Sequence, residues 1–306
     1  MTKQRFQGTG TAIVTPFGLD GMVDEKSLAR LVDFQIDAGI DMILPCGTTG
    51  EGATLETVEY ERVLSVVIER VDGRLPVIVG AGNNSTERAA RAAVRARELG
   101  ADGVLSVGPY YNKPTQSGYF EHFKAIAEAA DIPLLVYNVP SRTGGNIEAS
   151  TMLRLSEVPG IVGVKEASGD LGQVMEIIRN RPEGFHVLSG DDWAALAVIA
   201  LGGDGVVSVV ANEVPRTMRE MVDAAMEGRL DRARELHYQI LPLMSANFIE
   251  TNPIPVKAVL AMMGLIDENY RLPLVPPSSD NRETLRGIAH DMGLLAPAGV
   301  GHGNAK

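Results

Sequence analysis

The sequence predicts a (β/α)8 barrel of the TIM type followed by an appended C-terminal helical bundle. About eight short runs rich in Val, Ile and Leu alternate with longer segments of helical period, and a closed barrel of this class needs eight strands. The runs are continuously apolar, which is typical of parallel strands in a sheet that is covered on both faces. We expect the strands near residues 10–15, 41–46, 76–80, 103–107, 133–137, 161–165, 186–189 and 205–209.

Capping residues mark the helices that we expect between these strands. Asp24 can cap a helix whose apolar residues recur at three- and four-residue spacing, and Gly39 lies just past its end. Ser85 can likewise open an Ala- and Arg-rich helix that stops at Gly100. Gly, Pro or Asn marks most other junctions, as the alternation of strand and helix requires.

Beyond the eighth strand only helical signals remain. Asn212 and Asn252 are each followed closely by a proline, as at helix starts, and Asp280 with Glu283 has capping-box spacing. We read residues 211–295 as the last barrel helix plus the appended bundle. The expected division is a barrel over 1–225, a C-terminal helical region over 226–295 and a Gly-rich, mobile tail over 296–306.

Composition narrows the functional classes. A chain of 306 residues with 45% hydrophobic residues can bury a large core, and its formal net charge of -11 argues against a nucleic-acid partner. The single cysteine, Cys46, excludes an intramolecular disulfide, and the five histidines lack paired metal-ligand spacing. With no apolar signal segment or membrane-length run, we expect a cytoplasmic protein with no metal and no membrane partner.

Two residues at the ends of neighbouring expected strands suggest Schiff-base chemistry. Lys165 ends the apolar run 161–165, and Tyr137 ends the preceding run. Burial lowers the pKa of a lysine toward that of a free, nucleophilic amine, and barrel enzymes place their chemistry at these strand ends. The alternative is that Lys165 simply marks where a strand meets water. Lys113 and Lys257, near plausible surfaces, follow no buried strand and rank below Lys165 as nucleophiles.

The loops after these strands offer further candidates, each with a structural alternative. Thr48 and Thr49 lie in a Gly-Thr-Thr-Gly turn, which lacks the Gly-Lys-Ser/Thr ending of a phosphate loop but can hold a carboxylate. Taken alone, the motif is more simply explained as a tight turn. Arg142 suits a bidentate carboxylate or is an exposed loop arginine, and Tyr110 with Tyr111 could be a packing pair. Cys46 is most simply a small buried hydrophobic residue.

Taken together, these segments resemble the dihydrodipicolinate synthase family of the class I aldolase-like superfamily, which includes N-acetylneuraminate lyase. The resemblance runs from about Gly8 to about Leu295 and keeps the order of five separated motifs. The motifs occupy residues 47–51, 109–114, 137–143, 163–166 and 252–257.

The resemblance implies a mechanism without metal or separate cofactor, in which Lys165 forms a covalent imine with pyruvate. Tyr137 matches the family's proton shuttle, and Thr49 with Tyr111 completes a hydroxyl relay. Tyr111 would reach in from a neighbouring subunit, which implies a homo-oligomer, with a dimer of dimers as the expected tetramer. Thr48 would join Thr49 in holding the pyruvate carboxylate.

The resemblance also implies the second substrate, L-aspartate 4-semialdehyde. Arg142 matches the residue that holds its carboxylate, and backbone carbonyls at Gly190 and Val207 would line the pocket. The product would be 4-hydroxy-tetrahydrodipicolinate, on the diaminopimelate route to lysine. Related sugar-acid aldolases do not usually carry the Ser-Arg-Thr segment around Arg142, so this segment favours the semialdehyde.

The chain departs from the family where lysine-inhibited members bind lysine. The matching positions are Thr57, Tyr60, Asn84, Arg88 and Tyr110. Inhibited bacterial members carry histidines at the first two positions and glutamate at the fourth. Arg88 would repel the lysine ammonium, so we expect weak or absent lysine feedback.

Two other functions stay open on the sequence. One is a different pyruvate-dependent Schiff-base aldolase or dehydratase that acts on a sugar acid. The other is a catalytically silent barrel that binds small carboxylates. The joint presence of Lys165, Tyr137, Thr49, Tyr111 and Arg142 argues against a silent barrel, because a binding protein has no need of the full relay.

Overall fold

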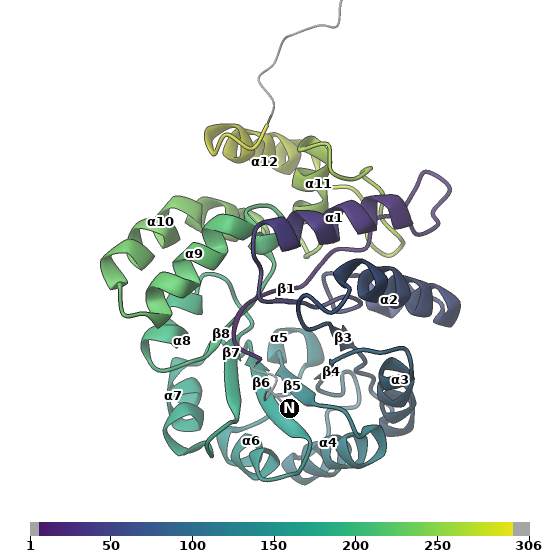
Figure 1. Cartoon of the computed structure of the whole chain (residues 1–306), viewed down its shortest axis with the longest axis vertical. Coiled ribbons are helices and arrows are strands. Elements are labelled where there is room, and N and C mark those ends of the chain that lie inside the picture. Colours follow the sequence, from purple (N-terminus) through teal and green to yellow (C-terminus); the bar gives the residue numbers. More distant parts are fainter. Residues whose placement is uncertain (1–5, 296–306) are drawn as a thin grey trace, which may run out of the picture.

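The computed structural model describes residues 6–295 and contains one sheet of eight parallel strands surrounded by helices (Figure 1). The order of the strands is β2-β1-β8-β7-β6-β5-β4-β3, and an isolated parallel bridge between Ile43 and Val77 connects its two ends. The sheet is therefore a nearly closed barrel, which confirms the predicted fold class. The strands are β1 (Gly8–Thr11), β2 (Met42–Ile43), β3 (Ile78–Gly80), β4 (Gly103–Val107), β5 (Leu134–Asn138), β6 (Ile161–Glu166), β7 (His186–Ser189) and β8 (Gly205–Ser208).

Helices alternate with the strands and then continue alone. The α10 helix packs on α9, and α12 packs on both α10 and α11. Figure 1 shows α11 and α12 beyond α1, outside the ring of barrel helices. The helices are α1 (Glu25–Asp37), η1 (Gly52–Thr54), α2 (Thr57–Val71), α3 (Thr86–Glu98), α4 (Gln116–Ala130), α5 (Pro140–Thr143), α6 (Ala149–Ser156), α7 (Leu171–Asn180), α8 (Ala195–Ala200), η2 (Val210–Asn212), α9 (Pro215–Met226), α10 (Leu230–Ala246), α11 (Ile254–Met262) and α12 (Ser279–Asp291).

Two of the predicted helix caps are present. The Asp24 side chain accepts a hydrogen bond from the backbone N–H of Ser27, and the Ser85 side chain accepts one from Arg88. Each satisfies a backbone donor that the first turn of a helix leaves free. The local sequence therefore sets where α1 and α3 begin.

The cap predicted for the last helix is wrong. Ser278, not Asp280, caps α12 by accepting from the N–H of Asn281, and Asp280 lies in the first turn. The α9 and α11 helices do begin near Asn212 and Asn252, but neither asparagine side chain caps a helix. Both side chains are instead engaged in long-range hydrogen bonds across the barrel. The predicted mobile tail, 296–306, lies outside the described residues.

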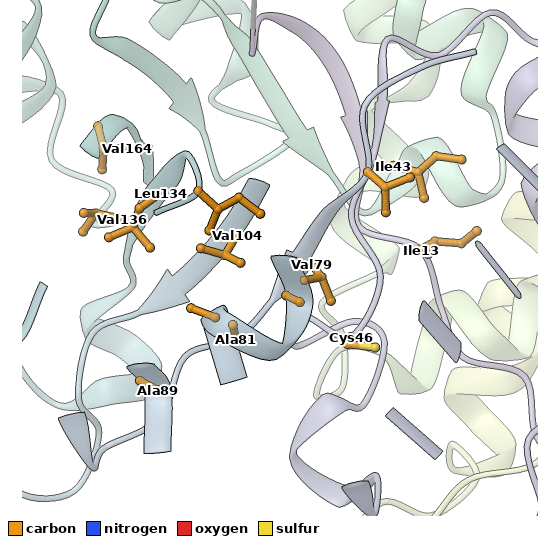
Figure 2. Close-up of a cluster of buried hydrophobic side chains, with 14 of the residues drawn as sticks. Ile13, Ile43, Cys46, Val79, Ala81, Ala89, Val104, Leu134, Val136 and Val164 are labelled. Carbon is orange, nitrogen blue, oxygen red and sulfur yellow. The ribbon is translucent and has the colours of Figure 1, made fainter. Parts of the chain in front are cut away.

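The strands alternate their side chains between two apolar layers. Val136 and Val164 belong to the cluster between strands and helices, several of whose members are labelled in Figure 2. Leu135 and Tyr137 belong to the separate cluster inside the barrel. Because successive strand residues point to opposite faces, the side chain of Lys165 points to the inner face, opposite to that of Val164.

No helix within residues 6–295 is long and apolar enough to cross a membrane.

Candidate active site

Lys165 lies buried inside the barrel beside Tyr137. The two residues are register partners on β5 and β6, and Lys165 Nζ is 4.3 Å from the centre of the Tyr137 ring. Burial lowers the pKa of Lys165 to about 8; Asp191 and Asp192 oppose this shift, while Arg142 adds to it. A useful fraction of the amine is therefore uncharged near neutral pH, as a lysine nucleophile requires.

Gly190 leaves the space that the Lys165 side chain occupies. A Cβ atom at Gly190 would lie 3.2 Å from Lys165 Cε and 2.7 Å from the Cβ of Ala167. Cβ atoms in proteins do not approach other atoms as closely as the 2.7 Å to Ala167 Cβ, so any larger residue at position 190 would displace the lysine or its strand. Position 190 therefore needs a glycine if the Lys165 side chain is to keep its place.

A cavity of about 410 Å³ opens at the carboxyl ends of the strands. It brings together six of the residues that the sequence analysis singled out: Thr48, Thr49, Tyr137, Arg142, Lys165 and Gly190. They come from the loops after β2, β5 and β7 and from β5 and β6 themselves. A cavity with a buried amine, a phenol, two hydroxyls and a guanidinium can hold a small anion and form an imine with its carbonyl group.

Asn252 links the threonine turn to Arg142. Its Nδ2 atom donates to Thr49 Oγ1 at 3.0 Å, and its backbone carbonyl accepts from Arg142 Nη2 at 3.3 Å. The Asn252 side chain thus occupies one acceptor position of the Thr49 hydroxyl, which leaves the hydroxyl proton free to point elsewhere. The sequence around Asn252 indicated only a helix start and part of a motif, and it contains no signal for this contact.

Tyr137 is held as a neutral phenol. Burial, with the charge of Asp191, raises its pKa to about 12, although Arg142 and a hydrogen bond with Thr48 act in the opposite direction. The phenol therefore carries its proton throughout the physiological pH range. It can pass that proton on only through hydrogen-bonded neighbours.

Two predicted residues lie outside this cavity. Val207 is buried in β8 but is not among the lining residues, whereas Val209 is. Tyr111 is 90% exposed and has a left-handed backbone with φ of 73°. The single chain therefore does not bring Tyr111 to Tyr137 and Thr49.

One wall of the cavity comes from the connection between α10 and α11. Phe248, Glu250, Thr251 and Asn252 line it, and Asp191 and Val209 line the barrel side. Asp191 closely follows the strand expected near 186–189, but nothing in the sequence indicated that residues 248–252 fold over the barrel mouth. Such a contact between distant segments leaves no local periodic signal.

Lys257 lies in the interior, which contradicts the expectation that it is near a surface. Its side chain is fully buried, pairs with Glu51 and lies 4.4 Å from the centre of the Phe17 ring. Burial lowers the pKa of Lys257, while the charge of Glu51 opposes that shift. Since Glu51 directly follows the turn containing Thr48 and Thr49, its ion pair with Lys257 anchors one end of that turn in the interior.

A second cavity, of about 820 Å³, shares Thr48, Thr49 and Lys165 with the first and extends between α2 and α3. Its further lining includes four of the residues that match the family's lysine site: Thr57, Tyr60, Arg88 and Tyr110. The fifth, Asn84, is not a lining residue, and its backbone carbonyl accepts a hydrogen bond from Asn112. Arg88 is exposed and forms no ion pair among the residues described.

Metal-ligating side chains do not gather anywhere in the described part of the chain. No group of three or more His, Cys, Asp or Glu residues within 6–295 could hold a metal ion. Cys46 is buried and unpaired, and burial raises the pKa of its thiol. It therefore has the properties of the small hydrophobic residue that the sequence indicated.

Known proteins are similar to this chain in both sequence and architecture. The chain is 51% identical over 297 residues to a 4-hydroxy-tetrahydrodipicolinate synthase of Koribacter versatilis, covering 97% of this chain and 99% of that protein. A second enzyme of that name, from Syntrophus aciditrophicus, is 51% identical over 290 residues, covering 95% and 99% of the two chains.

Solved structures of similar proteins have the same fold as this chain. The crystal structure of dihydrodipicolinate synthase from Aquifex aeolicus superposes with a TM-score of 0.93 at 46% identity, covering 95% of this chain and 100% of that one. The Acinetobacter baumannii dihydrodipicolinate synthase, solved in complex with pyruvate, gives a TM-score of 0.93 at 45% identity and covers 94% and 99% of the two chains. With residues 5–292 matching its family model, this chain belongs to the Dihydrodipicolinate synthetase family.

Proposed function

We propose that the chain is a 4-hydroxy-tetrahydrodipicolinate synthase, a lyase that condenses pyruvate with L-aspartate 4-semialdehyde. The observation that supports this most directly is the position of Lys165 Nζ, 4.3 Å from the Tyr137 ring, in a cavity that Arg142 also lines. The relatives named above carry the same activity name. Through this reaction the chain serves the diaminopimelate route to lysine.

Lys165 begins the reaction as a neutral amine. Its nitrogen attacks the ketone carbon of pyruvate, and loss of water gives an imine. Thr48 and Thr49 hold the pyruvate carboxylate, since they lie together in one turn and both line the cavity. No separate cofactor is needed, because the imine is itself the electron sink. A proton then leaves the pyruvate methyl group and an enamine forms.

The enamine carbon attacks the aldehyde of the second substrate, whose carboxylate Arg142 holds. Tyr137 moves the protons of these steps with help from Thr49 and Tyr111. The amine of the semialdehyde then attacks the imine carbon, which closes the ring and releases Lys165. The backbone carbonyl at Gly190 completes the pocket.

The relay needs a second subunit. Tyr111 is exposed in the single chain, and its left-handed backbone is costly for a non-glycine residue unless surroundings hold it. We therefore propose that Tyr111 enters the site of a partner within a dimer, and that two dimers form a tetramer. The single unpaired thiol of Cys46 agrees with a cytoplasmic location.

Steady-state turnover tests the proposed reaction. L-aspartate 4-semialdehyde is offered with pyruvate, and in parallel each member of a panel of sugar acids is offered alone; consumption of the semialdehyde or of the sugar acid is followed. We expect turnover with the semialdehyde to exceed that of every sugar acid. Faster turnover of a sugar acid would identify a different aldolase, and Lys165→Arg is the matched inactive control.

A further inference from the structure

Glu213 and Asn247 form a buried polar pair just behind the active-site cavity. Glu213 is 1% exposed and Asn247 is 0% exposed, and Asn247 Nδ2 donates to Glu213 Oε2 at 2.6 Å. Glu213 follows η2 after β8, while Asn247 follows the end of α10. The bond therefore joins the end of the barrel to the first residue of the connection between α10 and α11.

The pair has two oxygen atoms left over. Glu213 Oε1 and Asn247 Oδ1 are both buried and have no hydrogen-bond partner among the described residues. If Glu213 is a carboxylate, both atoms are acceptors and cannot bond to one another. A proton on Oε1 makes it a donor, and a carboxylic acid and a primary amide can then form two complementary hydrogen bonds.

The surroundings of Glu213 also favour the neutral acid. A buried carboxylate with a single neutral donor is far less stable than the same group protonated. Burial raises the pKa of Glu213 well above its usual range, the Asn247 hydrogen bond opposes this, and the charge of Asp192 adds to it. Asp192 is itself buried and accepts from the backbone N–H groups of Val209 and Val210. Burial raises the pKa of Asp192, and its hydrogen bonds and the charge of Lys165 oppose that rise.

Each side of this pair continues into a wall of the cavity. Val209, four residues before Glu213, lines the barrel side, and Phe248 to Asn252, directly after Asn247, line the other except at position 249. Asn252 bonds both Thr49 and Arg142. A shift of this connection would therefore disturb Arg142, proposed to hold the second substrate, and the partner of Thr49, proposed to hold pyruvate, while Lys165, on β6, would stay in place.

We propose that Glu213 is a positioning residue that works as a neutral carboxylic acid, joined to the Asn247 amide by two hydrogen bonds that fix the cavity walls against each other. The effect on turnover rests on the proposed function. The protonation state does not, since it can be observed without substrate.

Infrared difference spectroscopy on the full-length protein tests the protonation directly. The spectrum of wild type minus Glu213→Gln at neutral pH should contain the C=O stretch of one protonated carboxylic acid. A difference spectrum with carboxylate bands alone would overturn the proposal, whatever the enzyme's substrate. Glu213→Gln keeps an acceptor and a donor for Asn247, so we expect it to fold like wild type.

The positioning role is tested with Asn247→Leu, which removes both hydrogen bonds. We expect KM for aspartate semialdehyde to rise about tenfold, whereas Glu213→Gln stays within about twofold of wild type. At saturating pyruvate, borohydride trapping on Lys165 should be equal in all three proteins. Equal KM values in the folded Asn247→Leu and wild-type proteins would overturn the positioning role. If Asn247→Leu does not fold, the infrared result still decides the protonation state.

Discussion

The lowered pKa of Lys165 has a consequence that can be measured without any substrate. With a pKa of about 8, roughly 10% of the Lys165 amine is uncharged at pH 7. For a lysine at its ordinary value of 10.5 the fraction is about 0.03%. The burial of this side chain inside the barrel therefore increases the reactive form about 300-fold.

Competitive trace acetylation across pH 6 to 11 measures this directly. Only the uncharged amine reacts, so the labelling of Lys165, followed by peptide mass spectrometry, should rise to a midpoint near pH 8. Nα-acetyl-lysine amide serves as an internal standard with a pKa of about 10.4. A Lys165 midpoint that coincides with this standard would refute the reasoning, because burial would then have no net effect.

Asp191→Asn gives the matched perturbation. The Asp191 charge raises the pKa of Lys165, so its removal should move the midpoint to lower pH. Asp131→Asn is the control, since Asp131 is exposed and precedes β5 at the opposite end of the barrel. A midpoint that moves equally in both variants would contradict the assigned cause.

Three other expectations concern stability, space and regulation. Lys257→Met leaves the buried Glu51 carboxylate without its partner, so denaturant unfolding should show a loss of about 3–5 kcal/mol, and Lys257→Met with Glu51→Met should recover most of it. Gly190→Ala brings a methyl group 3.2 Å from Lys165 Cε and should slow trapping of pyruvate at least about tenfold without unfolding the protein. Sub-millimolar lysine should leave the initial rate unchanged, because Arg88 brings a positive charge to the second cavity.

Matched controls accompany these variants. Lys124→Met removes a half-exposed lysine, and an equal loss of stability there would contradict the role of the Lys257 pair. Gly287→Ala adds a methyl group where nothing lies within 4 Å, and equal trapping rates in the two alanine variants would contradict the crowding at Gly190. An inhibition curve with a sub-millimolar lysine midpoint would contradict the expected insensitivity.

Local patterns in the sequence predicted the part of the site that the strands carry. Tyr137 and Lys165 end apolar runs, and the two-residue period of a strand is enough to direct both into the barrel. The barrel itself followed from the alternation of strands and helices. The predicted strand near 41–46 was too long, since regular pairing in β2 is limited to Met42–Ile43 before Pro45.

Contacts between distant segments could not be predicted in this way. Asn252 bonds Thr49 across 203 residues, and its position next to a proline indicated only a helix start. The burial of Lys257 has a weak signal in hindsight, because it is the one charged residue in the otherwise apolar helix α11. Nothing near Glu213 or Asn247 in the sequence indicated that two polar side chains would meet in the core.

Borohydride reduction in the presence of pyruvate, followed by peptide mass mapping, tests the central claim most directly. We expect one added pyruvate-derived group per chain, located on Lys165 and absent from the Lys165→Arg variant. An adduct on another lysine such as Lys113 or Lys257, or no adduct at all, would contradict the assignment of Lys165 as the imine-forming residue.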